Sequence, residues 1–133
     1  MRYMLLIYGE ETRPDGPPGD AGDSPETSPP WMEYTAWLLR QGMHAAGERL
    51  ATSGSATTVR VRDGNRLITD GPYAETKEVL GGYYIIECEN LDEALDAAAR
   101  CPAVAFGGSI EIRPIIGMPL PEPETVRADR ATG

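Results

Sequence analysis

Residues 70–78, which read Asp-Gly-Pro-Tyr-Ala-Glu-Thr-Lys-Glu, hold the densest group of side chains that could do chemistry. Asp70 stands before Gly-Pro, so we expect its carboxylate on a tight turn with little conformational freedom, as a preorganised acid or base requires. Tyr73, Glu75 and Lys77 add a phenol, a second carboxylate and an ammonium, which can shift one another's pKa values. The segment therefore predicts a catalytic acid or base at Asp70 and ligand-binding groups at the other three positions.

A structural interpretation of the same residues stays open beside this one. Aspartate before Gly-Pro commonly forms a turn in which its carboxylate accepts hydrogen bonds from its own backbone. Glu75 and Lys77 could form no more than a surface ion pair, which contributes little to stability. The residues alone weight the two interpretations of Asp70 equally and favour the structural one for Glu75 and Lys77.

His44 is the only histidine of the chain and so the only side chain whose unperturbed pKa lies near neutrality. A lone histidine is more often structural or exposed than catalytic. Beside Asp70 in space it would form an acid–base pair, a proximity that the sequence cannot show. We take His44 as the second candidate catalytic residue, and Tyr8 of the first expected strand and Tyr34 of the first expected helix as candidate ligand contacts.

The charge of the chain argues against nucleic acid and acidic membrane surfaces as partners. The formal net charge is −9, from 21 acidic and 12 basic residues, whereas phosphate binding needs clustered Lys and Arg. The only dense basic group is Arg60, Arg62 and Arg66, which we interpret as the solvated face of a strand pair. No apolar run approaches the roughly 20 residues of a membrane span.

The cysteines and the first residues bear on cofactors and on location. Cys88 and Cys101 have neither C-x-x-C spacing nor a nearby histidine, so we expect no metal site, redox pair or cofactor. The apolar stretch within residues 1–8 is too short for the core of a signal peptide, and Glu10-Glu11 follows it instead of a cleavage site. We therefore expect a cytoplasmic protein.

Apolar periodicity and turn residues predict the order of strands and helices. The expected elements are a strand over 2–8, a helix over 29–41 that stops at Gly42, paired strands over 57–62 and 66–69 joined by Asp63-Gly64, a strand over 83–89, a helix that starts at the capping-box spacing of Asn90 and Glu93 and ends at Pro102, and a strand over 109–113. Residues 43–50 are expected to form the first half of a long, bent strand that leads into the hairpin.

Two segments stand apart from this pattern. Residues 12–30 contain six prolines with several glycines and aspartates, so we expect a mobile loop, with a lid over a pocket as the alternative. Ser28 is the expected cap of the helix that follows. Residues 117–133 are Pro-rich and polar and are expected to form a tail. We expect the rest of the chain, residues 1–116 with this inserted loop, to form one domain.

The order of elements predicts an α+β fold of the ferredoxin-like split βαβ plan with an extra hairpin. Both helices should cover one face of an antiparallel sheet. The other face also carries apolar residues in strands 2–8 and 83–89, so it needs a cover, for which a second copy of the same sheet is usual in domains of this plan. We therefore expect a homodimer, a dimeric α/β barrel.

Four stretches of the chain resemble YCII-related proteins of the DGPF type. They are Met-Arg-Tyr-Met-Leu-Leu-Ile-Tyr at 1–8, Thr-Thr-Val-Arg-Val-Arg-Asp-Gly at 57–64, the stretch 69–84 with its Asp-Gly-Pro-Tyr motif, and Glu-Ile-Arg-Pro at 111–114. The fourth motif letter is Tyr73 instead of Phe. The resemblance implies a dimeric α+β barrel with a pocket in each subunit between the sheet and neighbouring loops.

The resemblance implies less about chemistry. Wider YCII relatives have been proposed to be enzymes because a His and an Asp meet in a pocket, and a dehydrochlorinase of a chlorinated hydroxyquinone looks related. In those relatives the histidine lies on the first helix, where this chain offers Tyr34 and Trp37, so only Asp70 is carried over, as the acidic member. Genes of this type often stand beside extracytoplasmic-function sigma factors.

Two functions therefore remain. The first is binding of a small molecule, with cofactor-independent proton transfer or elimination (isomerase- or lyase-like) in which Asp70 is the acid or base and His44, Tyr8 or Tyr73 assists. The second is a non-enzymatic regulatory or accessory module that senses a ligand or contacts a sigma factor, as the missing helix histidine and the acidic loop suggest. We favour ligand binding.

Overall fold

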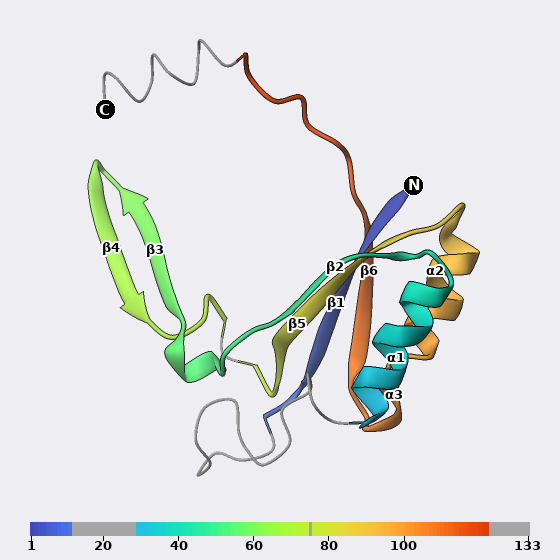
Figure 1. Ribbon diagram of the computed structural model, residues 1–133. Helices are drawn as coiled ribbons and strands as arrows, with labels where there is room; N and C mark the ends of the chain where they lie inside the picture. The colour runs from blue at the N-terminus through green and yellow to red at the C-terminus, as the bar shows by residue number, and fades with distance from the viewer. Residues whose placement is uncertain (12–28, 75, 123–133) are drawn as a thin grey trace.

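A computed structural model of the chain describes residues 1–11, 29–74 and 76–122 (Figure 1). Its elements are β1 (Arg2–Glu10), α1 (Pro29–Arg40), β2 (His44–Arg49), the 3-10 turn η1 (Ser53–Ser55), β3 (Thr57–Arg62), β4 (Asn65–Asp70), β5 (Glu78–Glu87), α2 (Leu91–Ala99), α3 (Pro102–Ala105) and β6 (Ser109–Pro114). The expected loop up to residue 28, the Ser28 cap and the tail beyond residue 122 lie outside the described residues.

Four strands form one antiparallel sheet in the order β2-β5-β1-β6. The connection from β1 through α1 to β2 leaves room for β5 between the two strands, which is the split βαβ arrangement. The α+β fold expected from the order of elements is confirmed. Within the described ranges, no helix has the length and apolar content that a membrane span requires.

The helices α1, α2 and α3 lie together on one face of this sheet (Figure 1). The core between them contains Leu5 of β1, Leu38 of α1 and Ile86 of β5, all fully buried. Because successive side chains of a strand point to opposite faces, Tyr3 and Leu5 face the helices while Met4 and Leu6 face away. The apolar pattern of strand 2–8 thus supplies both faces of the sheet.

The end of α1 and the start of α2 follow their predicted signals, whereas Pro102, expected to end the second helix, begins the short helix α3 after α2 has ended at Ala99. At the end of α1, the Gly42 N–H donates to the Leu39 carbonyl and the Met43 N–H to the Leu38 carbonyl, and Gly42 has φ +70°. This is the Schellman geometry that favours glycine. At the start of α2, the Asn90 side chain accepts from the Glu93 N–H at 3.0 Å. Glu93 in turn accepts from the Glu89 N–H, so the predicted cap is confirmed.

Both cysteines are free and buried. Burial is the main cause that raises the pKa of the Cys101 thiol, to about 11. A buried thiol held in its neutral form behaves as a small apolar side chain. Both cysteines are thus part of the apolar core.

Strand β5 begins five residues earlier than expected and runs through Gly81-Gly82. A bulge lies where the partner of β1 changes from Gly82, opposite Ile7, to Leu80, opposite Tyr8. The extra residue at Gly81 lets the pairing continue to Glu78 instead of ending at the glycines. Glu78, the last residue of the segment 70–78, is therefore the first residue of β5.

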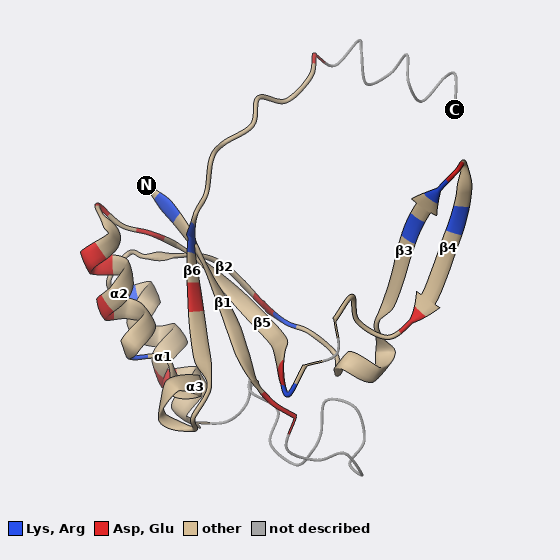
Figure 2. Ribbon diagram, turned by 180° about the vertical axis from the view of Figure 1, so that it is seen from behind, with Lys and Arg blue, Asp and Glu red and all other residues tan. Residues whose placement is uncertain are grey.

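The expected long, bent strand over 43–50 is a shorter strand that ends before the hairpin. The Leu50 N–H donates to the Gly81 carbonyl at the edge of the sheet, and η1 then carries the chain away. β3 and β4 form a two-stranded sheet of their own, which we call the arm (residues 57–70). In Figures 1 and 2 the arm projects on the side of the main sheet opposite the helices.

The sheet face that points away from the helices is called the open face. It carries half-buried apolar side chains from the two central strands: Met4, Leu6, Tyr8, Tyr83 and Ile85. No described helix covers it (Figure 1). The expectation that this face is apolar agrees with the structure of the chain.

Candidate functional site

The first part of segment 70–78 forms the base of the arm. Asp70 ends β4 opposite Thr57 and is exposed. Gly71 has φ +103°, a conformation that favours glycine, and its N–H donates to the Ala56 carbonyl at 2.7 Å. The Thr58 hydroxyl donates to the Gly71 carbonyl at 2.9 Å. These two bonds hold the Asp70 backbone on a defined turn, as the Gly-Pro sequence predicts.

Tyr73 lies exposed beyond this turn, next to the arm. The Arg60 guanidinium of β3 stands 4.9 Å from the centre of its ring, a cation–π contact. Tyr73 is three residues from Asp70 along the chain, so its phenol is a group near the candidate acid. Glu75 lies outside the described residues.

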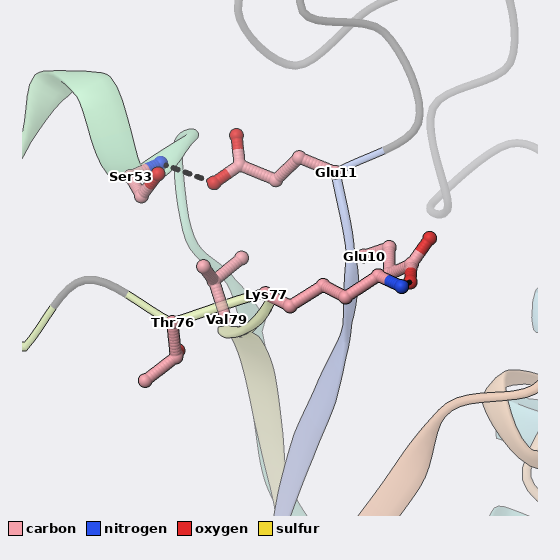
Figure 3. Close-up of a pocket in the computed structure, with 6 residues that line it drawn as sticks. All are labelled: Glu10, Glu11, Ser53, Thr76, Lys77 and Val79. Carbon is pink, nitrogen blue, oxygen red and sulfur yellow. Dashed lines mark hydrogen bonds and ion pairs between the residues drawn. The ribbon is translucent and has the colours of Figure 1, made fainter.

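The second part of the segment lines a shallow pocket of about 330 Å³ at the end of β1 (Figure 3). The pocket brings together residues from β1, η1 and the start of β5. Its lining is Glu10, Glu11, Ser53, Thr76, Lys77 and Val79. Antiparallel pairing of Glu10 with Glu78 places Lys77 beside the acidic end of β1.

The polar groups of this pocket carry both signs of charge. Lys77 Nζ lies 3.3 Å from Glu10 Oε1. The Ser53 N–H donates to Glu11 Oε1 at 3.0 Å, and the Thr76 hydroxyl donates to the Glu78 carbonyl. The Lys77 side chain is 85% exposed, so its ion pair is weak and can open for a ligand without large cost. The pocket can therefore bind a polar molecule through the ammonium of Lys77 and the carboxylates of Glu10 and Glu11.

The structure does not bring His44 and Asp70 together within one chain. His44 lies opposite Ile86 of β5, and Asp70 precedes the other end of that strand at Glu78. Eight residues of extended strand span about 27 Å. The His44 ring contacts the Tyr84 ring edge-on, with 6.1 Å between the ring centres. His44 thus lies at the sheet edge beside the aromatic core.

Tyr8 and Tyr34 lie on opposite faces of the sheet. Tyr8 is half-buried on the open face, opposite Leu80 and Ser109. Tyr34 is buried under α2, where its hydroxyl donates to the Ala97 carbonyl at 2.7 Å. Burial, followed by the nearby Cys101 and Tyr84, raises the pKa of Tyr34 well above its usual value. Tyr34 therefore contributes to the core between helices and sheet and is not among the residues that line the pocket.

Sequence reasoning missed the residues that face Lys77 across the pocket. Glu10, Glu11 and Ser53 come from segments that were interpreted as a strand end and a connection. The signal that could have found Glu10 is its position at the end of an apolar strand, because antiparallel pairing with the strand after the motif places it beside Lys77. In the described part of the chain, no three His, Cys, Asp or Glu side chains are grouped so that they could hold a metal ion.

The sheet order, the helices on one face and the inserted hairpin define an α+β domain of the split βαβ class. The chain belongs to the YCII-related domain family, whose profile matches residues 1–119. A curated relative, an uncharacterised protein from Rhizobium meliloti (strain 1021), is 47% identical over 68 residues. The match covers 50% of this chain and 55% of that protein, so the chain spans about half the length of the relative it matches.

Proposed function

We propose that this YCII-family domain, of the DGPF type, binds a small polar molecule in the pocket beside Lys77. The observation that carries the proposal is the meeting of segment 70–78 with Glu10, Glu11 and Ser53 at the end of β1 (Figure 3). A ligand with both a hydrogen-bond donor and an acidic or carbonyl oxygen matches this mixture of groups. Hydroxyaromatic compounds are ligands of this kind, and hydroxylated lactones combine a carbonyl oxygen with a donor.

Chemistry on such a ligand would be proton transfer or elimination without a cofactor, with Asp70 as the acid or base. Asp70 lies at the base of the arm and is not one of the residues that line the pocket, so the reacting part of the ligand would have to extend from the pocket toward the arm. The exposed carboxylate on a turn held by two hydrogen bonds supports this role. Tyr73 is the assisting group nearest to Asp70 along the chain, whereas Tyr8 lies on the open face and His44 at the far end of β5. The reaction class is isomerase- or lyase-like.

We further propose that the chain is a homodimer in which a second copy covers the open face. The apolar side chains there would otherwise remain in contact with water. A cytoplasmic location agrees with the two free thiols, which are typical of proteins in reducing compartments.

A thermal-shift screen of hydroxyaromatic compounds and lactones tests the binding proposal. Lys77 is the only lysine of the chain. We expect at least one compound to raise the melting temperature of the native chain and Lys77→Met to remove that shift. Arg40→Met, which removes an exposed cation at the far end of α1, is the matched control and should keep the shift. A screen without any stabilising compound, or a shift that survives Lys77→Met, would contradict the proposal.

The catalytic part has its own test. A compound that binds is incubated with the protein, and its conversion is followed by NMR. We expect Asp70→Asn to abolish turnover while leaving the thermal shift of the compound unchanged. Equal turnover by Asp70→Asn and the native chain would remove Asp70 from the mechanism.

The alternative function is a regulatory or accessory module that contacts a protein such as an extracytoplasmic-function sigma factor. The observation that favours it is the exposed apolar surface of the arm, since such surfaces mark protein contacts. A pull-down with the candidate sigma factor decides it. Failure to recover any complex, together with ligand-induced stabilisation, would leave small-molecule binding as the function.

A further inference from the structure

The arm is an amphipathic ribbon with one apolar face. In its register Val59 stands opposite Ile68, and Val61 stands opposite Arg66. Since paired residues of an antiparallel ladder share a face, Val59, Val61 and Ile68 lie together. Arg66 shares this face, and the opposite face carries Arg60, Arg62 and Leu67. The exposed fractions of the three apolar residues are 60%, 69% and 63%.

The rest of the described chain leaves the arm uncovered. Every residue from 57 to 70 is exposed except Thr58. An isolated two-stranded hairpin is only marginally stable in water. Three large aliphatic side chains on one face of such a hairpin are expected where that face packs on another surface.

Turns at its tip and at its base hold the arm in a defined conformation. At its tip, Asp63 and Gly64 both have positive φ, +54° and +79°, which is the tight hairpin turn that matches the twist of the strands. At its base, the bonds of Gly71 with Ala56 and Thr58 close the ribbon. The arm therefore leaves the domain as a defined ribbon whose two ends are both fixed by turn geometry.

The arm projects on the side of the open face, away from the helices (Figures 1 and 2). A second copy seated on the open face must therefore pass alongside the arm. The charge of the arm as a whole has the opposite sign to the rest of the chain, and Arg66 lies on the same face as the three aliphatic residues. The arm has three arginines and two aspartates, a net charge of +1, in a chain of net charge −9, so the remainder of each copy carries −10.

We propose that the arm of each copy clasps the other copy of a symmetric dimer, with Val59, Val61 and Ile68 packed against the partner. A twofold dimer uses the same surface on both copies, so one contact buries two open faces and two arms. The inference rests on the proposed homodimer and adds the element that holds it. Because Asp70 ends β4, the clasp also places the candidate acid at the border of the dimer interface.

Sedimentation equilibrium on four proteins tests the clasp. For the native chain we expect the mass of two chains. For Val61→Asp combined with Ile68→Asp we expect the dissociation constant of the dimer to rise by about 100-fold or more, because two aliphatic side chains leave the interface and two charges enter it. Leu67→Asp is the matched control, since it makes the same kind of change on the opposite face of the arm. Its dimer should have the same dissociation constant as that of the native chain.

The fourth protein, Tyr83→Asp, separates the clasp from the dimer itself, because Tyr83 lies on the open face. We expect it to have the mass of one chain. If Tyr83→Asp is monomeric while the double variant of the arm dimerises as tightly as the native chain, the clasp is wrong. The proposal that the open faces form the dimer would still stand. A native chain with the mass of one chain would overturn both. Far-ultraviolet circular dichroism confirms that each variant is folded.

Discussion

At the scale of single residues, close backbone contacts decide which small residues can be replaced. Gly82 lies in β5 opposite Arg49 of β2. A Cβ at this position would lie 2.8 Å from the Glu48 carbonyl oxygen, which belongs to the backbone of the neighbouring strand. The ladder between β2 and β5 would have to shift to make room. Gly54, in contrast, has nothing within 4 Å of such a Cβ.

We therefore expect Gly82→Ala to lower the free energy of unfolding by about 2 kcal/mol, as overpacking in a well-packed site does. Gly54→Ala is the control and should change it by less than about 0.5 kcal/mol. Urea denaturation followed by circular dichroism measures both. Equal midpoints for the two variants would mean that β2 and β5 separate freely at this point.

Tyr34 is the residue whose ionisation reports on the core. Burial raises its pKa in the folded chain, so the folded state keeps the hydroxyl proton at a pH where the unfolded state, with a pKa near 10, loses it. Its contribution to stability is present below pH 10 and is lost as the pH rises above that value.

Between pH 9 and 11 we expect the native chain to lose about 1 kcal/mol more free energy of unfolding than Tyr34→Phe does. Below pH 9 the variant should be less stable by about 1 kcal/mol, because the Ala97 carbonyl loses a hydrogen bond. Urea unfolding of both proteins across this range gives the difference. Parallel pH profiles would show that Tyr34 ionises as readily in the folded chain as in the unfolded one.

At the scale of elements, a side-chain cap defines where α2 begins. The first turn of α2 has Asn90 as its cap and Asp92 and Glu93 as acidic residues near the positive end of the helix dipole. The second acceptor, Glu93, bonds to the N–H of Glu89, one residue before the cap. The turn between β5 and α2 is thus fixed by two side chains.

Replacement of Asn90 by Ala should lower the free energy of unfolding by about 1 kcal/mol, since the Glu93 N–H loses its acceptor. Glu89→Ala is the control, because it keeps the bond from the Glu93 N–H to Asn90 and the bond from its own N–H to Glu93. Thermal unfolding by calorimetry compares the two. If Asn90→Ala and Glu89→Ala had the same melting temperature, the cap would contribute nothing to the stability of α2.

At the scale of the whole molecule, the open face is only half-buried and the arm is exposed in a single chain. Apolar surface on both, on the same side of the domain, is the physical basis of the proposed dimer. Association of folded copies stabilises them in proportion to the logarithm of protein concentration.

We therefore expect the melting temperature of the native chain to rise over a 100-fold increase in protein concentration. Tyr83→Asp, with a charge on the open face, should melt at a temperature independent of concentration. Scanning calorimetry at several concentrations makes the measurement. A constant melting temperature for the native chain would mean that unfolding does not involve dissociation.

Local signals allowed much of the fold to be predicted from sequence. Gly42, Asp63-Gly64 and Asn90 each act on their own few neighbours, and each ends or starts an element where it was expected. The continuation of β5 through Gly81-Gly82 was not predicted. It depends on a bulge against β1, and the pairing of strands that are distant in sequence is not visible in either strand alone.

The candidate site likewise has features that follow from local sequence and features that depend on strand pairing. The chain itself determined the turn at Asp70-Gly71-Pro72, the α+β plan and the apolar character of both sheet faces, because turn chemistry and side-chain alternation are local properties. Only the tertiary structure decided that Lys77 pairs with Glu10 while Glu11 accepts from Ser53, that His44 lies at the end of β5 far from the start that follows segment 70–77, and that residues 57–70 form a separate arm. Those facts follow from the register of antiparallel strands, which depends on contacts between residues tens of positions apart.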